Sequence, residues 1–488
     1  MESETRRNDI SMEQIIKEAE REVMLLCSNT GKAYIKVSRE NAASQLIPVD
    51  SETFEEWFRA YCYDKYGRIL SPGGHAQAQA HIRMKARQMK NRSKFYKRIY
   101  ERPDAIYYDL GREDGKYLKI TAENIKLVKN SRILFHHSAI FAPQTEPDFE
   151  NASPKDVMRF IKRHFNFKSE SDRILFAVFL VGCFFGERFS NPVLEIYGQK
   201  ASAKSTCFKR IQDLIDPLTV NPLFPMSRKE NEVAMCLTEE YMVCFDNISY
   251  ISQDISDLLC RNYTRTVQVR RKLFTDNTQS ISEPNAIVCI NSTRQCIMRS
   301  DLADRAIFLE LERIKPEEML GDEELKKKWE KDRPLFFGAL CQTVRGVLGD
   351  GNPPAKPSPV RMVDFYEMAV KAGRQLGYAE EKVYEAFRLN RKKINESVVS
   401  GNVLLMAIEN FMEREENRDG IRCRVSDFYR DLKIYAMEEC GINGRSFPGA
   451  PEVMTRKMSE DRSNLEDTGI FFVVKKGKNA SYIEIWRQ

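Results

Sequence analysis

The sequence predicts an α/β protein whose central part is a parallel sheet with helices on both faces. Short apolar strands alternate with helical stretches over residues 151–345, which is typical of a parallel sheet buried on both sides. A smaller α+β pattern precedes this part, over residues 1–150. Two helical stretches and a β-hairpin follow over residues 416–488, which suggests a winged-helix-like domain.

The composition is that of an ordinary globular protein. The chain has 488 residues, 42% hydrophobic and 30% charged, which suggests about three domains. Lys and Arg number 77 and Asp and Glu 71, and the net charge of +6 excludes a binder that relies on overall charge. The apolar run 174–185 is too short to span a membrane, and the charged N-terminus does not resemble a signal peptide. Twelve scattered cysteines without a CxxC pair favour reduced core thiols over disulfides or zinc. We therefore expect a cytoplasmic protein.

The N-terminal region is expected to hold an amphipathic helix over 51–69 and a strongly basic helix over 76–102. Turn residues then separate four short β-like runs. These runs are 105–110, 116–120, 125–128 and 133–137.

The central region begins with a helical pair over 155–186 and continues with alternating strands and helices. The expected strands are VLEIYG, MVCFD, AIVCIN and AIFLEL. A Pro- and Gly-rich break over 349–359 follows, so residues 346–415 are expected to form a linker and a helical lid.

The most informative motif begins at Gly198, where the strand VLEIYG leads into QKASAKST and a helical stretch. The string matches G-x-x-x-x-G-K-[ST], except that Ala203 replaces the second glycine. In such a loop the backbone N–H groups converge on phosphate oxygens at a helix N-terminus. Lys204 would contact the β- and γ-phosphates and Ser205 would hold Mg²⁺, which makes ATP and Mg²⁺ the expected ligands. Alanine is tolerable at position 203 only if that residue is not left-handed.

The predicted nucleotide-binding residues are Gly198, Gln199, Lys200, Ala201, Ser202, Ala203, Lys204, Ser205 and Thr206. The competing interpretation is an ordinary strand–loop–helix turn with a chance Lys-Ser pair.

A second motif, YMVCFDN, is an apolar run that ends in Asp246. A carboxylate at the carboxyl edge of a parallel sheet can hold Mg²⁺ through water, as in a Walker B strand. Asn247 follows, where many ATPases have a glutamate. An asparagine cannot accept a proton but can orient a water, so nucleotide binding is more secure than hydrolysis. The alternative is a buried strand that ends in an Asx turn.

Two further elements complete the predicted catalytic set. Asn291 ends the strand NAIVCIN and would lie beside the γ-phosphate as a polar sensor. Arg305 could stabilise transition-state charge at a neighbouring subunit, and Arg299 is the second choice. The alternative for either arginine is an ion pair with Asp301 or Asp304.

Taken together, the strings YGQKASAKST, FDNIS, SDLLCR, RKLFTD, INST and RSDLADRAIFLELERI resemble the AAA+ ATPases of bacterial mobile elements and phages. These are replication proteins related to superfamily 3 and minichromosome-maintenance-type helicases. The resemblance spans about residues 75–488 and implies nucleotide and Mg²⁺ roles for Lys204, Ser205 and Asp246. It also implies that Asn291 is the polar sensor and that Arg305 is an arginine finger, which contacts the nucleotide of a neighbouring subunit. Ala201 departs from the family, which usually has a glycine there.

Basic clusters indicate where DNA would bind. The segment 261–272 has no acid, and in the resembled helicases a hairpin at this place lines a central channel. The expected DNA contacts are Arg265, Arg270, Arg271, Lys272, Lys475, Lys476 and Lys478. A solvated loop or subunit contacts are the alternative for 261–272. The stretch 451–465, a recognition helix by position, is rich in acids, so protein contact is the alternative there.

Two functions follow from these observations. The first is an ATP-driven motor on single-stranded or forked DNA, a homo-hexameric ring helicase in the replication of a mobile element or phage. A primase or polymerase partner would supply synthesis, and no membrane is involved. The second is a nucleotide-switched DNA-binding or helicase-loading factor that hydrolyses ATP slowly.

Overall fold

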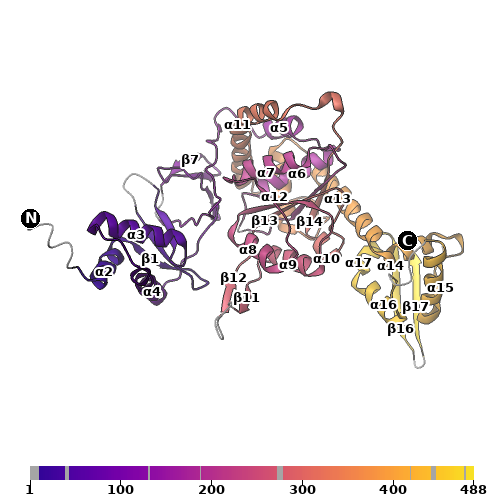
Figure 1. The fold of residues 1–488 in the computed structure, drawn as a ribbon. Coiled ribbons are helices and arrows are strands. Elements are labelled where there is room, and N and C mark those ends of the chain that lie inside the picture. Colours follow the sequence, from indigo (N-terminus) through magenta and orange to yellow (C-terminus); the bar gives the residue numbers. More distant parts are fainter. Residues whose placement is uncertain are drawn as a thin grey trace, which may run out of the picture.

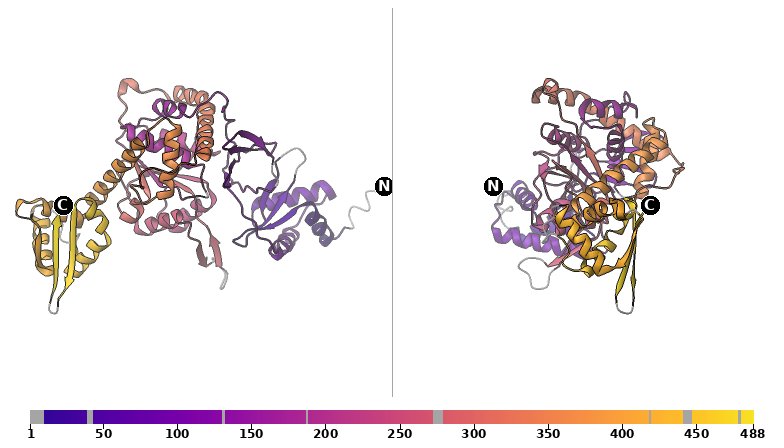
Figure 2. Two further views of the ribbon diagram at one scale, coloured as in Figure 1. Left: turned by 180° about the vertical axis from the view of Figure 1, so that it is seen from behind. Right: turned by 90° about the vertical axis from the view of Figure 1, so that its right-hand side faces the viewer.

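Three structural units follow one another along the chain (Figure 1). The computed structural model describes residues 10–38, 43–129, 132–186, 188–271, 279–417, 419–440, 447–477 and 480–488. Two further views show the C-terminal unit attached to the central unit through the long helix α13 (Glu380–Gly401) (Figure 2). The arrangement follows the chain order expected from the sequence.

The N-terminal unit is a three-stranded antiparallel sheet, in the order β1-β2-β3, packed against helices. A serine side chain caps each helix at its N-terminus, and α3 ends at Gly67 in the left-handed conformation. The basic helix expected over 76–102 was wrong beyond Gln88, since residues 99–101 pair as a strand. The elements are α2 (Met12–Glu22), β1 (Met24–Cys27), β2 (Ala33–Val37), β3 (Gln45–Pro48), α3 (Glu52–Tyr66) and α4 (Pro72–Gln88).

A four-stranded antiparallel meander lies between this unit and the parallel sheet. Its strands are β4 (Ile99–Glu101), β5 (Ala105–Tyr108), β6 (Tyr117–Thr121) and β7 (Ile125–Val128). Residues 133–137, expected as the last of the four β-like runs, form only a single bridge between Phe135 and Tyr96. Alternate side chains of β5 and β6 (Ile106, Tyr108, Leu118 and Ile120) belong to the same hydrophobic cluster as the central helices.

The central unit contains a five-stranded, all-parallel sheet in the order β14-β8-β13-β10-β9. Side chains alternate between two hydrophobic clusters on its two faces: Cys244 lies in one, Val243 and Phe245 in the other. Burial on both faces explains the continuous apolar strands of the sequence. The strands are β8 (Val193–Tyr197), β9 (Leu223–Phe224), β10 (Met242–Ile248), β13 (Ile287–Ser292) and β14 (Ala306–Glu310).

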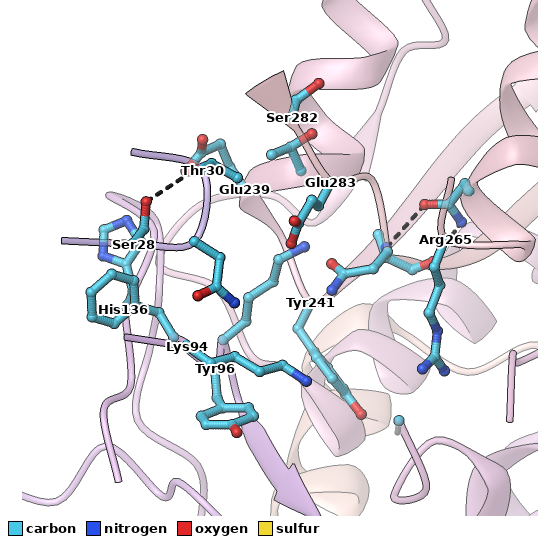
Figure 3. A pocket seen from close by; sticks show the side chains of 18 of the residues that line it. Ser28, Thr30, Lys94, Tyr96, His136, Glu239, Tyr241, Arg265, Ser282 and Glu283 are labelled. Carbon is cyan, nitrogen blue, oxygen red and sulfur yellow. Dashed lines mark hydrogen bonds between the residues drawn. The ribbon is translucent and has the colours of Figure 1, made fainter. Parts of the chain in front are cut away.

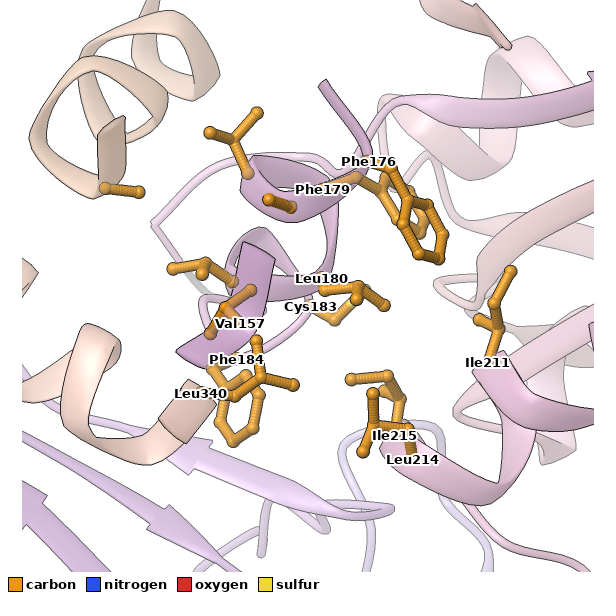
Figure 4. Packing of buried hydrophobic residues seen from close by; sticks show 14 of the residues in the cluster. Val157, Phe176, Phe179, Leu180, Cys183, Phe184, Ile211, Leu214, Ile215 and Leu340 are labelled. Carbon is orange, nitrogen blue, oxygen red and sulfur yellow. The ribbon is translucent and has the colours of Figure 1, made fainter. Parts of the chain in front are cut away.

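Helices cover both faces of this sheet, and a hairpin of β11 (Gln268–Arg271) and β12 (Gln279–Ser282) projects from it (Figure 1). In Figure 4, side chains of α6 lie between Leu340 of α11 and Ile211 of α7. The helices are α5 (Asp156–His164), α6 (Glu170–Gly182), α7 (Lys204–Ile215), α8 (Glu230–Glu239), α9 (Gln253–Tyr263), α10 (Ser300–Ala303), η1 (Pro316–Glu318), α11 (Asp322–Gly349) and α12 (Val363–Gln375). Among the described residues, no helix combines the length and apolarity that crossing a bilayer requires. The twelve cysteines are all free thiols.

The C-terminal unit follows α13 and holds a three-stranded antiparallel sheet in the order β15-β17-β16. Asp467 receives hydrogen bonds from Arg391 and Asn395 of α13, and Asp461 from Ser300 of the central unit. The single helix expected over 451–465 is divided at Asp461. The elements are α14 (Val403–Glu413), η2 (Glu415–Asn417), β15 (Ile421–Arg424), α15 (Val425–Glu438), α16 (Pro451–Glu460), α17 (Arg462–Asp467), β16 (Ile470–Lys476) and β17 (Ser481–Arg487).

A buried ion pair joins the meander to the parallel sheet. Arg98 is fully buried, and its Nε donates to Asp216 Oδ1 over 2.8 Å. Its other nitrogens donate to the carbonyl oxygens of Asp109, Ala142 and Pro217. The second oxygen of Asp216 accepts the backbone N–H of Met242, at the start of β10. The guanidinium is thereby satisfied on several sides, as a buried charge requires.

We predict that Arg98→Met destabilises the protein by about 3–5 kcal/mol, because it leaves the Asp216 carboxylate buried without its partner. Arg102→Met is the matched control, since Arg102 pairs with Asp104 at an exposed site and should cost at most about 1 kcal/mol. Urea unfolding of both variants measures the difference. Equal losses would show that the buried pair has no special part in stability.

Candidate functional site

The loop 198–203 joins the carboxyl end of β8 to the N-terminus of α7. Strand β8 is an inner strand, with β14 on one side and β13 on the other. After β8 the chain crosses to β9, at the far edge on one side of β8. After β13 it crosses back to β14, on the other side of β8. The loop therefore lies at a point where the strand order reverses, which is where open α/β sheets bind ligands.

The lysine that follows the loop, Lys204, folds back and bonds to the start of the loop. Lys204 Nζ donates to the carbonyl oxygens of Gly198 over 2.7 Å and Gln199 over 2.9 Å. Ser202 is buried and its hydroxyl also donates to Gln199 O. A Cβ atom at position 198 would approach Leu311 O and Ser202 Oγ to 2.8 Å, so only glycine fits there.

Two alanines of the loop have left-handed backbones. The φ angle is 64° at Ala201 and 56° at Ala203. Ala203 therefore does not meet the condition given for tolerating alanine there, a backbone that is not left-handed. The fold retains this shape because the neighbours fix it: Ala201 O accepts the N–H of Ile314, and Ala203 O accepts the N–H of Cys207. The loop thus adopts a strained conformation that glycine would enter more easily.

The first turn of α7 has no side-chain cap: Ala203 occupies the N-cap position and contributes no side-chain hydrogen bond. Ser205 is exposed in this turn. An uncapped helix start presents backbone N–H donors and the positive end of the helix dipole. This end of α7 is chemically suited to an anion.

Asp246 and Asn291 meet at the same edge of the sheet. The two residues lie near the carboxyl ends of adjacent parallel strands, β10 and β13, and the Asn291 side-chain amide donates to Asp246 Oδ1. The pairing shifts register between Phe245 and Ile248, so a bulge carries Asp246 and Asn247. Bulges of this kind redirect side chains at the end of a strand. Asn291 Oδ1 is buried and has no hydrogen-bond partner within the described part of the chain.

Asn247 has a left-handed backbone with φ of 56° and an exposed side chain. Asparagine is among the residues that enter this region most easily. The position after Asp246 therefore offers an amide to solvent and no carboxylate.

Lys204 is electrostatically linked to Asp246. Burial lowers the pKa of the Lys204 ammonium, and the nearby Asp246 carboxylate opposes that change. A partly desolvated lysine gains more from an anionic ligand than an exposed one, because there is less hydration to lose. Lys204, Asp246 and Asn291 thus form one polar cluster at the carboxyl edge of the sheet.

Glu195 is a functional candidate that sequence reasoning missed. It is fully buried in β8 and accepts hydrogen bonds from the Ser292 hydroxyl over 2.9 Å and from the N–H of Cys296 over 2.6 Å. Burial raises the pKa of its carboxyl, and these hydrogen bonds reduce the rise. The carboxylate holds the segment directly after Asn291. The signal was a charged residue inside the apolar run VLEIYG.

Arg299 and Arg305 both contact Asp301 in their own chain. Arg299 pairs with the Asp301 carboxylate over 3.1 Å and with Asp257 over 3.2 Å. Arg305 donates to the Asp301 carbonyl oxygen, and its guanidinium lies 5.7 Å from the centroid of the Tyr263 ring. The intrachain ion pair considered as an alternative therefore exists for Arg299. The finger role of either arginine stays a prediction.

The predicted DNA contacts fall into two groups. Arg265 follows α9 with a left-handed backbone, and Arg270 and Arg271 belong to β11. Lys475 pairs with Glu484 across the C-terminal hairpin over 2.9 Å, and Lys476 ends β16. Lys272 and Lys478 lie outside the described residues.

The residues at the sheet edge fit a nucleotide with Mg²⁺. Among the described residues, no group of three or more His, Cys, Asp or Glu side chains forms a metal site by itself. Mg²⁺ in nucleotide sites typically takes only one or two carboxylates and completes its shell with water and phosphate. Asp246 and the exposed Ser205 hydroxyl would supply such a partial set, and the Asn291 side chain, whose amide contacts Asp246, keeps its carbonyl oxygen unpartnered among the described residues.

We predict that Ala201→Gly and Ala203→Gly each stabilise the protein by up to about 1 kcal/mol. Glycine removes the strain of a left-handed alanine, which is about 1–2 kcal/mol. Part of this gain is lost because glycine raises the conformational entropy of the unfolded chain. Ala60→Gly, at an exposed position inside α3, is the matched control and should destabilise by roughly 0.5–1 kcal/mol. Thermal unfolding gives the comparison. A loss in all three variants would contradict the strain.

A family model for the actinomycete integrative conjugative element replication protein matches residues 158–392. The matched segment includes the 198–203 loop, Asp246 and Asn291. No curated protein shows significant similarity to the chain.

Solved structures of the NrS-1 C-terminal region, all without ligand, also align with the chain. They cover 97% of this chain and 98% of theirs at 10% identity, with TM-scores of 0.39, 0.37 and 0.38. Scores this low do not establish a shared overall fold. The match to residues 158–392 supports a replication protein of a mobile element.

Proposed function

We propose that this protein is an ATP-dependent motor on DNA, a ring helicase with an AAA+ P-loop core that acts in replication of a mobile element or phage. The observation that carries the proposal is the convergence of Lys204, Asp246 and Asn291 beside the uncapped start of α7. The family match to a replication protein of integrative conjugative elements supports the DNA context.

In this proposal the loop 198–203 and the first turn of α7 bind the phosphates of ATP. Lys204 leaves the carbonyl oxygens of Gly198 and Gln199 and moves its ammonium to the β- and γ-phosphates. Ser205 and Asp246 would hold Mg²⁺, which supplies charge neutralisation for phosphoryl transfer. Asn291 orients the Asp246 carboxylate through its amide and keeps its carbonyl oxygen for a water or a hydroxyl donor.

Arg305, with Arg299 as the second choice, would act at the nucleotide of the neighbouring subunit in a homo-hexamer. Both arginines are positioned by Asp301 at the start of α10. The β11–β12 hairpin would track one DNA strand through its phosphates. A primase or polymerase partner would supply the synthesis that follows strand separation.

A second function is favoured by Asn247. The residue after Asp246 presents an amide rather than a carboxylate, so deprotonation of the attacking water has no base at this position. A nucleotide-switched DNA-binding or helicase-loading factor would bind ATP tightly and release phosphate slowly. Tight ATP binding without DNA-stimulated phosphate release would favour this function over the motor.

We predict that Lys204→Ala lowers DNA-stimulated ATP hydrolysis by ~100-fold or more, because transition-state charge loses a direct cationic contact. Lys209→Ala is the matched control: it removes the same charge from an exposed position of the same helix and should retain the wild-type rate. The measurement is phosphate release with and without single-stranded DNA. A Lys204→Ala protein with full activity would refute the proposal, and negative-stain images with an ATP analogue would test the ring.

A further inference from the structure

A cavity lies between the N-terminal unit and the central unit, away from the Lys204 loop (Figure 3). Its volume is about 180 Å³ and it opens to solvent. One wall comes from residues 28–34, 93–99 and His136, and the other from residues 238–241, 262–265 and 281–287. The two walls belong to parts of the chain far apart in sequence.

Cations from both walls line the cavity. Lys32 and Lys94 are exposed on the N-terminal wall, and Arg265 lies on the opposite wall (Figure 3). The acids among the lining residues are Glu239 and Glu283, and Glu239 is paired with Lys32 over 3.6 Å. The lining is therefore cationic on balance, and Lys94 and Arg265 approach it from opposite sides.

Aromatic rings accompany these cations. Phe95 and Tyr96 are half-buried on the N-terminal wall, and the Lys94 ammonium lies 5.3 Å from the centroid of the Tyr96 ring. The Phe95 ring packs 4.5 Å from that of Tyr34. Cations interleaved with partly exposed rings are the lining that sequence-tolerant binders of single-stranded nucleic acid use.

The two walls are held together by polar contacts, one of which comes from Lys97 in the lining of the cavity. Lys97 Nζ donates to the carbonyl oxygens of Leu237 over 3.1 Å and Glu240 over 2.8 Å, at the C-terminal end of α8. Burial lowers the pKa of Lys97 to about 8. Ser138 donates to the Glu240 carboxylate over 2.8 Å. The cavity thus has a preformed shape, which reduces the entropic cost of binding.

The cavity is continuous with the β11–β12 hairpin. Ile281, Ser282 and Glu283, at the end of β12, line it, as does Arg265 before β11. A DNA strand bound along the hairpin would therefore lie next to the cavity. With a volume of about 180 Å³, the cavity is too small for a duplex and takes only part of a single strand.

We propose that this cavity binds single-stranded DNA, with phosphates between Lys94 and Arg265 and a base against the rings of Tyr96 and Phe95. The inference deepens the proposed function and rests on it, since DNA is the ligand of that function. It gives the segment between α4 and β4 a direct part in holding the DNA strand.

The test measures binding of a fluorescent oligo-dT of about 20 nucleotides by anisotropy over a range of salt concentrations. Lys94→Ala should weaken binding and lower the salt slope by about 1, as loss of one phosphate contact does. Lys126→Ala removes the same charge from an exposed position of β7 and should leave both quantities unchanged. The same titration with oligo-U compares DNA with RNA, and stronger binding of RNA would overturn the assignment to DNA.

The aromatic contribution is tested separately. Tyr96→Leu should weaken binding roughly 5- to 100-fold with an unchanged salt slope, because it removes a stacking surface and no charge. Tyr96 packs against Tyr100 and Phe135, so Tyr96→Phe serves as the structural control and should retain wild-type affinity. Tyr63→Leu, an exposed tyrosine of α3, should also have no effect.

The outcomes separate this inference from the proposed function. If the wild type binds the oligonucleotide and Lys94→Ala and Tyr96→Leu match their controls, the cavity is not the DNA site and the motor proposal stands. If the wild type binds no oligonucleotide at all, both proposals fail. Crosslinking of 4-thiothymidine DNA to residues 93–97 would support the cavity, and crosslinks confined to the central unit would overturn it.

Discussion

The buried pair of Arg98 and Asp216 is the contact on which the geometry of the central unit depends. Asp216 follows the last turn of α7, whose first turn carries Lys204. Its carboxylate also accepts the first N–H of β10, the strand that carries Asp246. One charge pair therefore fixes the far ends of the two elements that present the candidate site. Because removal of either charge would leave the other buried and unpaired, the link is difficult to change.

At the carboxyl edge of the parallel sheet, where the candidate site lies, the backbone is strained. Ala201, Ala203 and Asn247 all have positive φ angles within the same small region. Such residues persist only where surrounding contacts determine the conformation, and they concentrate at functional sites. Here the contacts are the hydrogen bonds from Ile314 and Cys207 and the bulge in β10. The strained residues lie at the same place as the polar side chains of Lys204, Asp246 and Asn291, which favours a binding role over an ordinary turn.

Much of the fold was predictable because local patterns and burial agree. The apolar strands VLEIYG, MVCFD, AIVCIN and AIFLEL form the parallel sheet as expected, and the apolar stretch 174–185 lies in and just after the buried helix α6. The errors were also local. The basic helix expected over 76–102 stops at Gln88, because its later residues pair with the meander, and residues 133–137 form no strand. Residues 99–101 pair with the adjacent strand β5 in a hairpin, and residues 133–137 contribute only a bridge to Tyr96.

The sequence by itself determined the strand–loop–helix around Lys204 and the polar residues near the ends of the apolar strands. These features depend on the hydrophobic pattern of each segment, on the position of Gly198 and on the short spacing between Gly198 and Lys204. Only the tertiary structure decided that Asp246 and Asn291 are neighbours, since 45 residues separate them along the chain and strand order alone joins β10 to β13. It also decided the left-handed alanines, the buried Glu195 that holds the segment after Asn291, and the basic cavity at Lys94 and Arg265. Glu195, the cavity and the bond between Ile314 and Ala201 join segments far apart in the chain, which no local pattern records.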